Sequence, residues 1–397
     1  MTSLSGRRVA IVSRLYAPEP GAASFRLAAL ARALRESGAE VVVITARPPR
    51  GYAGEPAGHD DIEVRRAPVL RDRDGYVRGY LQYLSFDLPA LFRMLFARRV
   101  DLVVNEPPPT TGVVTRIANG LRRRPYVYYA ADIWSDAVAM TSAPRFVARS
   151  VRVMERWAVR GAAAVISASE VFTERMRELG YGDRIVTIGN GVDTTLFGPG
   201  DDRVELDHPY LLYAGTASEV HGAGIFLDAA EKLVPGMPEL RVVFIGQGSE
   251  RADLERRASA LGDGVVRFEG RLEPAEVSRW IRGAQATLAS VRPEGYHRAM
   301  ASKMYASVVC GTPVVYAGAG PGREFAGDPG VGWAVDYDVD AVAEAMREAL
   351  ARPRDEQERT RLAAWGAETL SLVAVARRGA EAVARVLAGA GRSRARE

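Results

Sequence analysis

Hydrophobic positions along the chain follow two alternating patterns. Continuous apolar runs at 9–12 and 41–44 are typical of short strands that are buried on both faces of a parallel sheet. Between these runs, Leu27, Leu30 and Leu34 recur at the spacing of one helix face. The pattern predicts a β-α-β unit, in which a right-handed crossover joins two parallel strands.

The same alternation continues along the chain, with one interruption. Further strands are predicted at 102–104, 126–129, 164–166, 184–186, 210–214, 241–245, 265–268, 286–289 and 313–316. Helices are predicted near 76–98, 112–123, 144–160, 170–179, 222–234, 249–261, 274–283, 299–309 and 339–351, and over most of 355–388. A glycine- and proline-containing cluster at 197–202 has the composition of a linker between the two series.

This organisation predicts an α/β protein of two doubly wound, Rossmann-like domains that face each other across a cleft. We place the first domain at 1–195 and the second at 196–371. A C-terminal helix at about 372–397 is expected to pack back on the first domain. Ligands of such domains bind in loops at the carboxyl ends of the strands, so we look for the site there.

Composition excludes several classes of protein and of site. With 397 residues, 47% of them hydrophobic and 26% charged, the chain fits a two-domain globular protein and not a disordered chain, a collagen or a coiled coil. The single cysteine, Cys310, excludes an intrachain disulfide and a multi-cysteine metal site. The four histidines are far apart in the sequence, which argues against a histidine zinc site.

Charge is distributed unevenly. Residues 1–195 carry 28 basic and 20 acidic side chains, net +8, whereas residues 196–397 carry 25 and 29, net −4. A basic first half suits an anionic partner, and scattered solubilising arginines explain it equally well. Nucleic-acid binding is not expected, because only the pI of about 9.2 favours it.

The start of the chain is short and polar, and an apolar strand follows at once, so we expect no signal peptide and a cytoplasmic protein. Two helical segments of the first domain, 88–99 and 146–160, mix aromatic residues with arginines. They fit either peripheral contact with the anionic inner face of a membrane or half-buried helices with a solvated arginine face.

Glycine turns follow three strands of the second domain, at 213–222, 245–250 and 267–272. Backbone N–H groups that are exposed where such a turn opens a helix favour a phosphate. The third turn could present its backbone to the edge of a nucleotide base. Each turn taken alone also fits an ordinary connection between strand and helix.

The segment 292–305 concentrates cationic side chains before a helix. It contains His297, Arg298 and Lys303, and lysine occurs at only one other position, Lys232. Cations beside a helix N-terminus make a favourable diphosphate site. The alternative is that Lys303 is an ordinary surface lysine.

Motifs in a fixed order link these features to a known family. They are YAPEPGAAS at 16–24, EPPPTTG at 106–112, DIWSD at 132–136, IGNGVD at 188–193, and ASKMY at 301–305 followed by CGTP at 310–313. In this order the chain resembles the GT4-type retaining glycosyltransferases of the GT-B fold. Within them it is similar to the branch that includes colanic-acid and O-antigen transferases.

The resemblance implies that the first domain binds an acceptor and the second binds a nucleotide-sugar, with UDP as the default nucleotide. No metal and no cofactor are expected. Donor binding is implied for Gly215, Thr216, His221, Gly246, Gly270, Arg271, Leu272, His297, Arg298, Ser302 and Lys303. Acceptor binding is implied for Arg14, Glu19, Gly21, Glu106 and Asp132. Catalytic roles are implied for Asp132, Glu294 and Lys303.

The chain also departs from the family pattern. Where the family has a Glu-x7-Glu pair, this sequence has Arg298 and Ala306, so either Glu294 takes that role or the pair is absent. Thr216 and His221 stand where the family has arginine and lysine. These changes leave two alternatives to a transferase, namely a nucleotide-sugar-binding partner subunit and a nucleotide-sugar epimerase of the same fold. The acceptor is open among a glycan, a lipid-linked intermediate and a small natural product.

Overall fold

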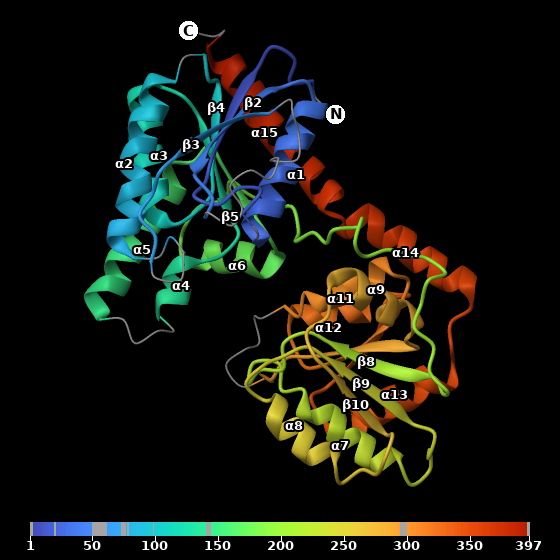
Figure 1. Ribbon diagram of the computed structural model, residues 1–397. Coiled ribbons are helices and arrows are strands. Elements are labelled where there is room, and N and C mark those ends of the chain that lie inside the picture. Colours follow the sequence, from blue (N-terminus) through green and yellow to red (C-terminus); the bar gives the residue numbers. More distant parts are fainter. Residues whose placement is uncertain are drawn as a thin grey trace. The chain divides into compact units, whose positions relative to one another are not determined.

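The computed structural model describes residues 3–19, 21–49, 62–72, 77, 79–97, 99–139, 144–293 and 300–394. The chain forms two compact units, the first made of Met1–Asn190 with Leu372–Glu397 and the second of Gly191–Ser371 (Figure 1). The first unit therefore ends at 190 and not at the predicted 195, and the cluster at 197–202 lies inside the second unit.

The first unit is built on a seven-stranded parallel sheet with the order β3-β2-β1-β4-β5-β6-β7. The strands are β1 (Arg8–Val12), β2 (Glu40–Ala46), β3 (Glu63–Ala67), β4 (Leu102–Asn105), β5 (Tyr126–Ala130), β6 (Ala164–Ser167) and β7 (Ile185–Thr187). β1 is an interior strand, where Val9 pairs with Val41 on one side and with Leu102 on the other. The continuous apolar runs of the central strands follow from burial on both faces.

Helices cover both faces of this sheet. They are α1 (Ala22–Glu36), α2 (Tyr80–Phe96), α3 (Pro109–Leu121), α4 (Trp134–Ala139), α5 (Arg145–Gly161), α6 (Glu170–Glu178) and α15 (Leu372–Arg394). On one face, Leu27 and Leu30 of α1 and Val383 of α15 share a core with Ile11. On the other, Phe86 and other apolar residues of α2, α3 and α5 pack with Val12. The C-terminal helix thus belongs to the first unit.

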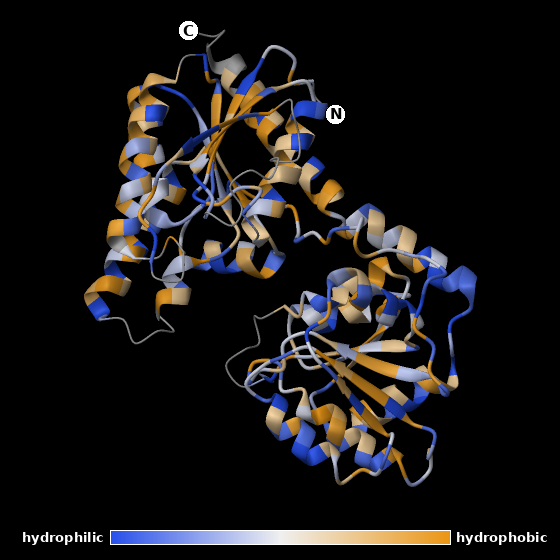
Figure 2. Ribbon diagram, viewed as in Figure 1, coloured by the Kyte–Doolittle hydropathy of each residue, from blue (hydrophilic) through white to orange (hydrophobic). Residues whose placement is uncertain are grey.

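The second unit has a six-stranded parallel sheet with the order β10-β9-β8-β11-β12-β13. Its strands are β8 (Tyr210–Ala214), β9 (Arg241–Ile245), β10 (Val266–Glu269), β11 (Ala286–Ser290), β12 (Val314–Ala317) and β13 (Gly332–Val335). Its helices are α7 (Gly224–Leu233), α8 (Arg251–Ala258), α9 (Pro274–Gly283), α11 (Lys303–Val309), α12 (Pro321–Gly327), α13 (Val339–Ala351) and α14 (Glu356–Leu370). Figure 2 shows the apolar strands at the centre of each unit.

Alternate side chains of the second sheet serve separate cores. Tyr213 and Phe244 pack with apolar residues of α7 and α13. Leu212 and Val243 point to the opposite face, where they pack with Trp280 of α9. The predicted doubly wound architecture is confirmed in both units.

Four elements were not predicted by the hydrophobic pattern. The edge strand β3 lacks a continuous apolar run because it is only partly buried, whereas β13 has the short apolar run GWAV, which the strand predictions above do not include. The short helices α4 and α12 contain too few turns to show periodicity. The helix predicted over most of 355–388 is two helices, α14 and α15, which meet at Ser371 where the chain returns to the first unit. Within the described residues, no helix combines the length and the apolar character needed to cross a bilayer.

Candidate functional site

Glycine turns at the carboxyl ends of β8 and β9 border a cavity of about 550 Å³ in the second unit. The segment 267–272 includes the end of the neighbouring strand β10, and its last two residues border the same cavity. The lining residues are Ala214, Gly215, Thr216, Ile245, Gly246, Gln247, Gly248, Arg271, Leu272 and Val277. Three turns that are separate in the sequence therefore form one pocket, because their strands are neighbours in the sheet.

The first two turns approach so closely that they require glycine. The N–H of Ala217 donates to the carbonyl of Gln247 at 2.9 Å. A Cβ at Gly246 would collide with the carbonyl of Gly215, and a Cβ at Gly248 would collide with that of Ala217. These glycines keep the backbone of both turns at the cavity wall.

Lys303 lies directly beside the Gly215 turn. It opens α11 and lines a smaller hollow of about 160 Å³, which shares Ala214 and Val277 with the main cavity. Its Nζ donates to Tyr213 Oη at 2.6 Å and lies 3.8 Å from the centre of that ring. Burial lowers the pKa of Lys303 to about 7. Lys303 is therefore a desolvated amine that titrates near neutral pH, and not an ordinary surface lysine.

His221 lies in the same loop and is neutral at neutral pH. Burial and then the nearby charge of Lys303 lower its pKa to about 4. Its Nδ1 is 2.9 Å from Ser218 Oγ, and its backbone carbonyl accepts a hydrogen bond from Ser290 Oγ at 2.6 Å. The histidine thus offers a neutral hydrogen-bonding group at the position where the family has a cation.

Sequence reasoning gave no role to Arg292, Glu250 and Tyr337, which support this loop from behind. Arg292 Nη2 donates to Glu250 Oε1 at 2.9 Å, and Tyr337 Oη donates to the carbonyl of Gly222 at 2.6 Å. Arg292 Nε and Glu250 Oε2 are buried without a partner among the described residues. Arg292 follows β11 almost directly, so its place at a strand end was the signal that could have identified it.

The predicted donor residues fall into three groups. Those that border a cavity are Gly215, Thr216, Gly246, Arg271, Leu272 and Lys303, and His221 lies in the adjacent loop. Gly270 and Ser302 are neighbours in sequence of residues that line these cavities, but they line neither, and Ser302 is exposed. His297 and Arg298 lie outside the described residues, as does Glu294, for which a catalytic role was predicted.

In the first unit, two of the predicted acceptor residues are buried at the carboxyl ends of strands. Glu106 follows β4 and accepts a hydrogen bond from Ser13 Oγ at 2.9 Å, and burial raises its pKa. Arg14 follows β1, donates to the carbonyl of Val77 at 2.6 Å, and lies 4.5 Å from the centre of the Tyr83 ring.

Glu19 and Gly21 have structural explanations. Both carboxylate oxygens of Glu19 accept hydrogen bonds from Arg71, at 2.9 and 2.8 Å, and the side chain is buried. Gly21 is the N-cap residue of α1. These two residues shape the first loop, and Glu19 has little carboxylate surface left for a ligand.

Asp132 and Asp136 differ sharply in their surroundings. Asp132 is exposed, and its carboxylate has no hydrogen bond or ion pair within the part of the chain that the structure describes. Asp136 forms two hydrogen bonds with Arg175, at 2.7 and 2.9 Å. Neither aspartate caps α4, because the Glu155 carboxylate accepts the N–H groups of Trp134 and Ser135. Asp132 is therefore free to contact a ligand.

No group of three potential metal ligands occurs in the described ranges. That a metal and a cofactor are not required stays a prediction.

Comparison with known proteins gives consistent matches in both units. Residues 21–191 match the family model of the glycosyl transferase 4-like domain, and residues 208–352 match that of glycosyl transferases group 1. Over 155 residues the chain is 33% identical to D-inositol 3-phosphate glycosyltransferase 1 of Catenulispora acidiphila, which covers 35% of this chain and 36% of that protein. It is 31% identical over 155 residues to D-inositol 3-phosphate glycosyltransferase of Acidothermus cellulolyticus, covering 35% and 34%. The match thus spans about a third of the length of these curated relatives.

Solved structures match over nearly the whole chain. Sucrose-phosphate synthase from Thermosynechococcus elongatus superimposes with a TM-score of 0.69 at 18% identity, covering 96% of this chain and 100% of that one. Anabaena HepE in complex with UDP and glucose gives a TM-score of 0.64 at 18% identity, with the same coverage. At these identities the similarity establishes the fold. The resemblance to the colanic-acid branch stays a prediction. The two family models and the shared fold together show that this chain belongs to the GT4-type glycosyltransferases of the GT-B fold.

Proposed function

We propose that the protein transfers a sugar from a nucleoside diphosphate sugar, with UDP as the default nucleotide, to a hydroxyl or other nucleophile of an acceptor. The observation that carries the proposal is the partly buried Lys303 amine, which lies beside the glycine turn that ends β8 and donates to Tyr213 Oη. The printed names of the relatives support it, since HepE was solved with UDP and glucose and the curated relatives are glycosyltransferases.

The second unit supplies the groups that a diphosphate needs. The backbone N–H groups of Thr216 and Gly248 have no hydrogen-bond partner among the described residues and belong to the turns that line the cavity. A phosphate held by these N–H groups would lie beside Lys303, whose charge is poorly solvated and therefore gains from an anionic partner. The base would lie against Arg271 and Leu272 on the third turn.

We propose that transfer retains the configuration at the anomeric carbon and requires no metal. The described lining of the donor cavity contains no carboxylate, so it offers neither a metal ligand of that kind nor a carboxylate base. In front-face attack, the bond from the anomeric carbon to the leaving phosphate breaks, the acceptor oxygen bonds to the same face, and a phosphate oxygen accepts the acceptor proton. Lys303 and the backbone N–H groups would stabilise the charge that develops on the leaving diphosphate.

The first unit is proposed to bind the acceptor, which is a cell-envelope glycan, a lipid-linked intermediate or a small natural product. Asp132 has an exposed carboxylate without a partner in the described residues, so it can orient an acceptor hydroxyl. Glu106 is buried at the end of β4, accepts a hydrogen bond from Ser13 Oγ and lies 3.7 Å from Arg26 Nη2, so its carboxyl group is held in a fixed position at this strand end. Glu19 and Gly21 act through the shape of the first loop.

We further propose that the first unit contacts anionic membrane on the cytoplasmic side. Apolar side chains form one exposed row along α2, namely Leu81, Leu84, Leu88, Phe92 and Phe96. α3 packs against α2 and α5 packs against α3, and α5 carries the exposed Phe146 and Trp157 with Arg149, Arg152 and Arg156. Exposed aromatic and aliphatic side chains next to arginines are the groups that bind the interface of an anionic bilayer.

Donor binding is the first test. Calorimetric titration of the full chain with UDP, GDP, dTDP and ADP, in the presence of a chelator, should show binding of one nucleotide. Lys303→Ala should weaken that binding by about 1.5–3 kcal/mol, the usual cost of losing a charged hydrogen bond. Lys232→Ala is the matched control, because the only other lysine is exposed and pairs with Asp340 on the surface.

Equal affinity in wild type and Lys303→Ala would refute the diphosphate site. Binding of a nucleotide-sugar without product over a broad acceptor panel would instead favour a partner subunit, and conversion of the free donor without acceptor would favour an epimerase. The anomeric configuration of the product, measured by NMR, tests retention.

A further inference from the structure

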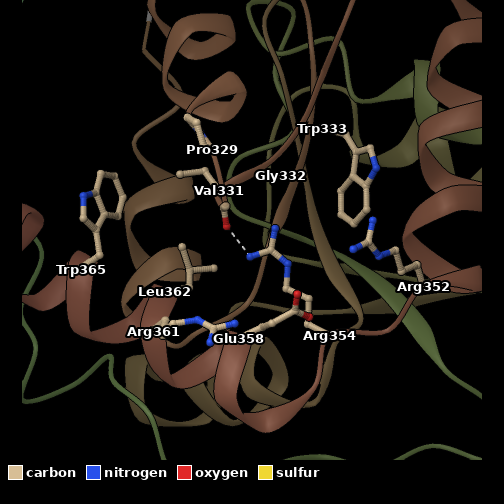
Figure 3. Close-up of a pocket in the computed structure, with 11 residues that line it drawn as sticks. Pro329, Val331, Gly332, Trp333, Arg352, Arg354, Glu358, Arg361, Leu362 and Trp365 are labelled. Carbon is tan, nitrogen blue, oxygen red and sulfur yellow. Dashed lines mark hydrogen bonds between the residues drawn. The ribbon is translucent and has the colours of Figure 1, made fainter.

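The second unit contains another cavity, at the amino end of its sheet. The glycine turns lie at the carboxyl end of the same sheet. This second cavity has a volume of about 550 Å³ and is bordered by the amino end of β13, by the segment after α13 and by one side of α14 (Figure 3). Gly332 is the first residue of β13, whereas the glycine turns follow the last residues of β8 and β9. Because all strands of this sheet are parallel, one cavity lies at the amino ends of the strands and the other at their carboxyl ends.

Arginine and tryptophan dominate the chemistry of this cavity. Its charged and aromatic lining residues are Arg352, Arg354, Arg361, Trp333, Trp365 and Glu358. Glu358 is the one carboxylate of this described lining, and it already accepts the N–H of Asp355 in the capping box of α14. The cavity therefore has a positive charge excess that nothing in its own lining neutralises.

Two of the three guanidinium groups in this cavity are available to a ligand. Arg354 donates to the carbonyl of Gly330, as the dashed line in Figure 3 marks. The side chains of Arg352 and Arg361 have no hydrogen bond and no ion pair within the described residues. Two unpartnered guanidinium groups and a third beside them repel one another and favour an anion, and the planar fork of arginine matches the oxygens of a phosphate.

The two tryptophans are held in place at opposite sides of the cavity (Figure 3). Trp333 Nε1 donates to Glu348 Oε2 at 2.9 Å. The Trp365 ring lies 6.2 Å from that of Phe325, between ring centres, and keeps 37% of its surface exposed. Fixed indole rings offer apolar area to a ring-shaped ligand at little entropic cost.

We propose that this cavity is a second ligand site, which binds a phosphorylated sugar with its phosphate monoester on the arginines and its ring against the indoles. The inference is independent of the proposed transfer reaction, because no residue of this cavity belongs to the donor pocket.

Calorimetric titration of the full chain with glucose 6-phosphate, inorganic phosphate and glucose tests the site. Each titration is repeated in a saturating mixture of UDP, GDP, dTDP and ADP. Glucose 6-phosphate should bind with a Kd of about 1 mM or tighter, inorganic phosphate about tenfold more weakly, and glucose with no measurable heat. The nucleotides should leave the affinity for glucose 6-phosphate unchanged, because the donor pocket is a different cavity.

The double variant R352A/R361A should weaken binding of glucose 6-phosphate at least tenfold, or by about 1.4 kcal/mol. Neither arginine has a side-chain partner to lose, so folding should be preserved, and circular dichroism checks this. R347A is the matched control, because Arg347 is an exposed arginine of α13 that pairs with Glu344 and does not line the cavity.

Three results would overturn the proposal. They are competition by the nucleotides, wild-type affinity in R352A/R361A, and the absence of binding at about 10 mM glucose 6-phosphate. If inorganic phosphate bound as tightly as glucose 6-phosphate, the sugar ring would contribute nothing to binding. That result would refute a site for phosphorylated sugars.

Discussion

At the scale of single residues, the surroundings of Lys303 determine how its protonation is coupled to donor binding. Lys303 is the first residue of α11, and its amine donates to Tyr213 Oη and faces the ring of the same tyrosine. Burial favours the uncharged amine, whereas a bound diphosphate favours the ammonium. Donor binding should therefore be linked to uptake of a proton by this one side chain.

The pH dependence of donor affinity tests this linkage. In the free protein the pKa of Lys303 is about 7, and a bound diphosphate raises it. Affinity for the donor should be greatest below pH 7, where the ammonium is already present. It should fall as the pH rises above 7, by up to about tenfold per pH unit, until the pKa of the complex is reached.

Calorimetry with UDP-glucose between about pH 6 and pH 9 measures the slope, since its phosphodiester groups do not titrate there. Lys303→Arg keeps a positive charge at every pH of this range and should flatten the profile. A slope that persists in Lys303→Arg would assign the proton to another group.

At the scale of elements, α4 depends on a carboxylate from a different helix. Glu155 of α5 accepts hydrogen bonds from the N–H groups of Trp134 and Ser135 and from Tyr181 Oη. The Glu155 side chain thus acts as an N-cap for α4, a helix of six residues. This helix begins two residues after Asp132.

Glu155→Ala should lower the free energy of unfolding by about 3 kcal/mol, because it leaves buried donors without a partner. Urea denaturation of the full chain measures the loss. Glu174→Ala is the control, since Glu174 is exposed on α6 and should change stability by less than about 0.5 kcal/mol. Equal stability of the two variants would contradict the capping role.

The glycine turns of the second unit are expected to tolerate a side chain at some positions and not at others. Gly248→Ala should abolish donor binding, since its φ of +151° disfavours a side chain and its Cβ would collide with the carbonyl of Ala217. Gly270→Ala should bind the donor like the wild type, because a Cβ there meets nothing within 4 Å. Calorimetry with the responding nucleotide compares the two. Loss of binding in Gly270→Ala as well would show that the ligand itself lies against that glycine.

At the scale of the whole molecule, each unit has its own sheet and cores, and the two differ in charge. The first half of the sequence is net positive, and α2, which carries the exposed apolar row, belongs to the first unit (Figure 1). The proposed membrane contact is therefore a property of one unit only.

Vesicle binding should depend on both charge and apolar surface. The full chain should sediment with phosphatidylcholine vesicles that contain about 30% phosphatidylglycerol, and much less with neutral vesicles or at high salt. Phe92→Ser with Phe96→Ser should abolish this binding, because both side chains are exposed on α2. Leu196→Ser, an exposed apolar residue of the second unit, is the control. Binding that is equal on neutral vesicles, or unchanged in the phenylalanine variant, would contradict the contact.

Sequence alone determined most of the elements, because a strand buried on both faces must be apolar throughout. It also located the glycine turns and singled out Lys303. Where burial is partial, as in β3, that constraint weakens and the pattern gave no prediction. The break between α14 and α15 carries neither glycine nor proline, so nothing local marked it.

Only the tertiary structure decided which side chains meet. Lys303 and Tyr213 are 90 residues apart, and they touch because β8 and β11 are neighbours in the sheet and α11 follows β11. Glu19 and Asp132 are equally plausible ligand groups in the sequence, yet Glu19 is paired with Arg71 and Asp132 is exposed. The cavity around Arg352 and Trp365 was likewise not foreseen. Hydrophobic periodicity fixes elements one at a time, whereas the partner of a charged group depends on how elements pack, and packing is a property of the folded chain.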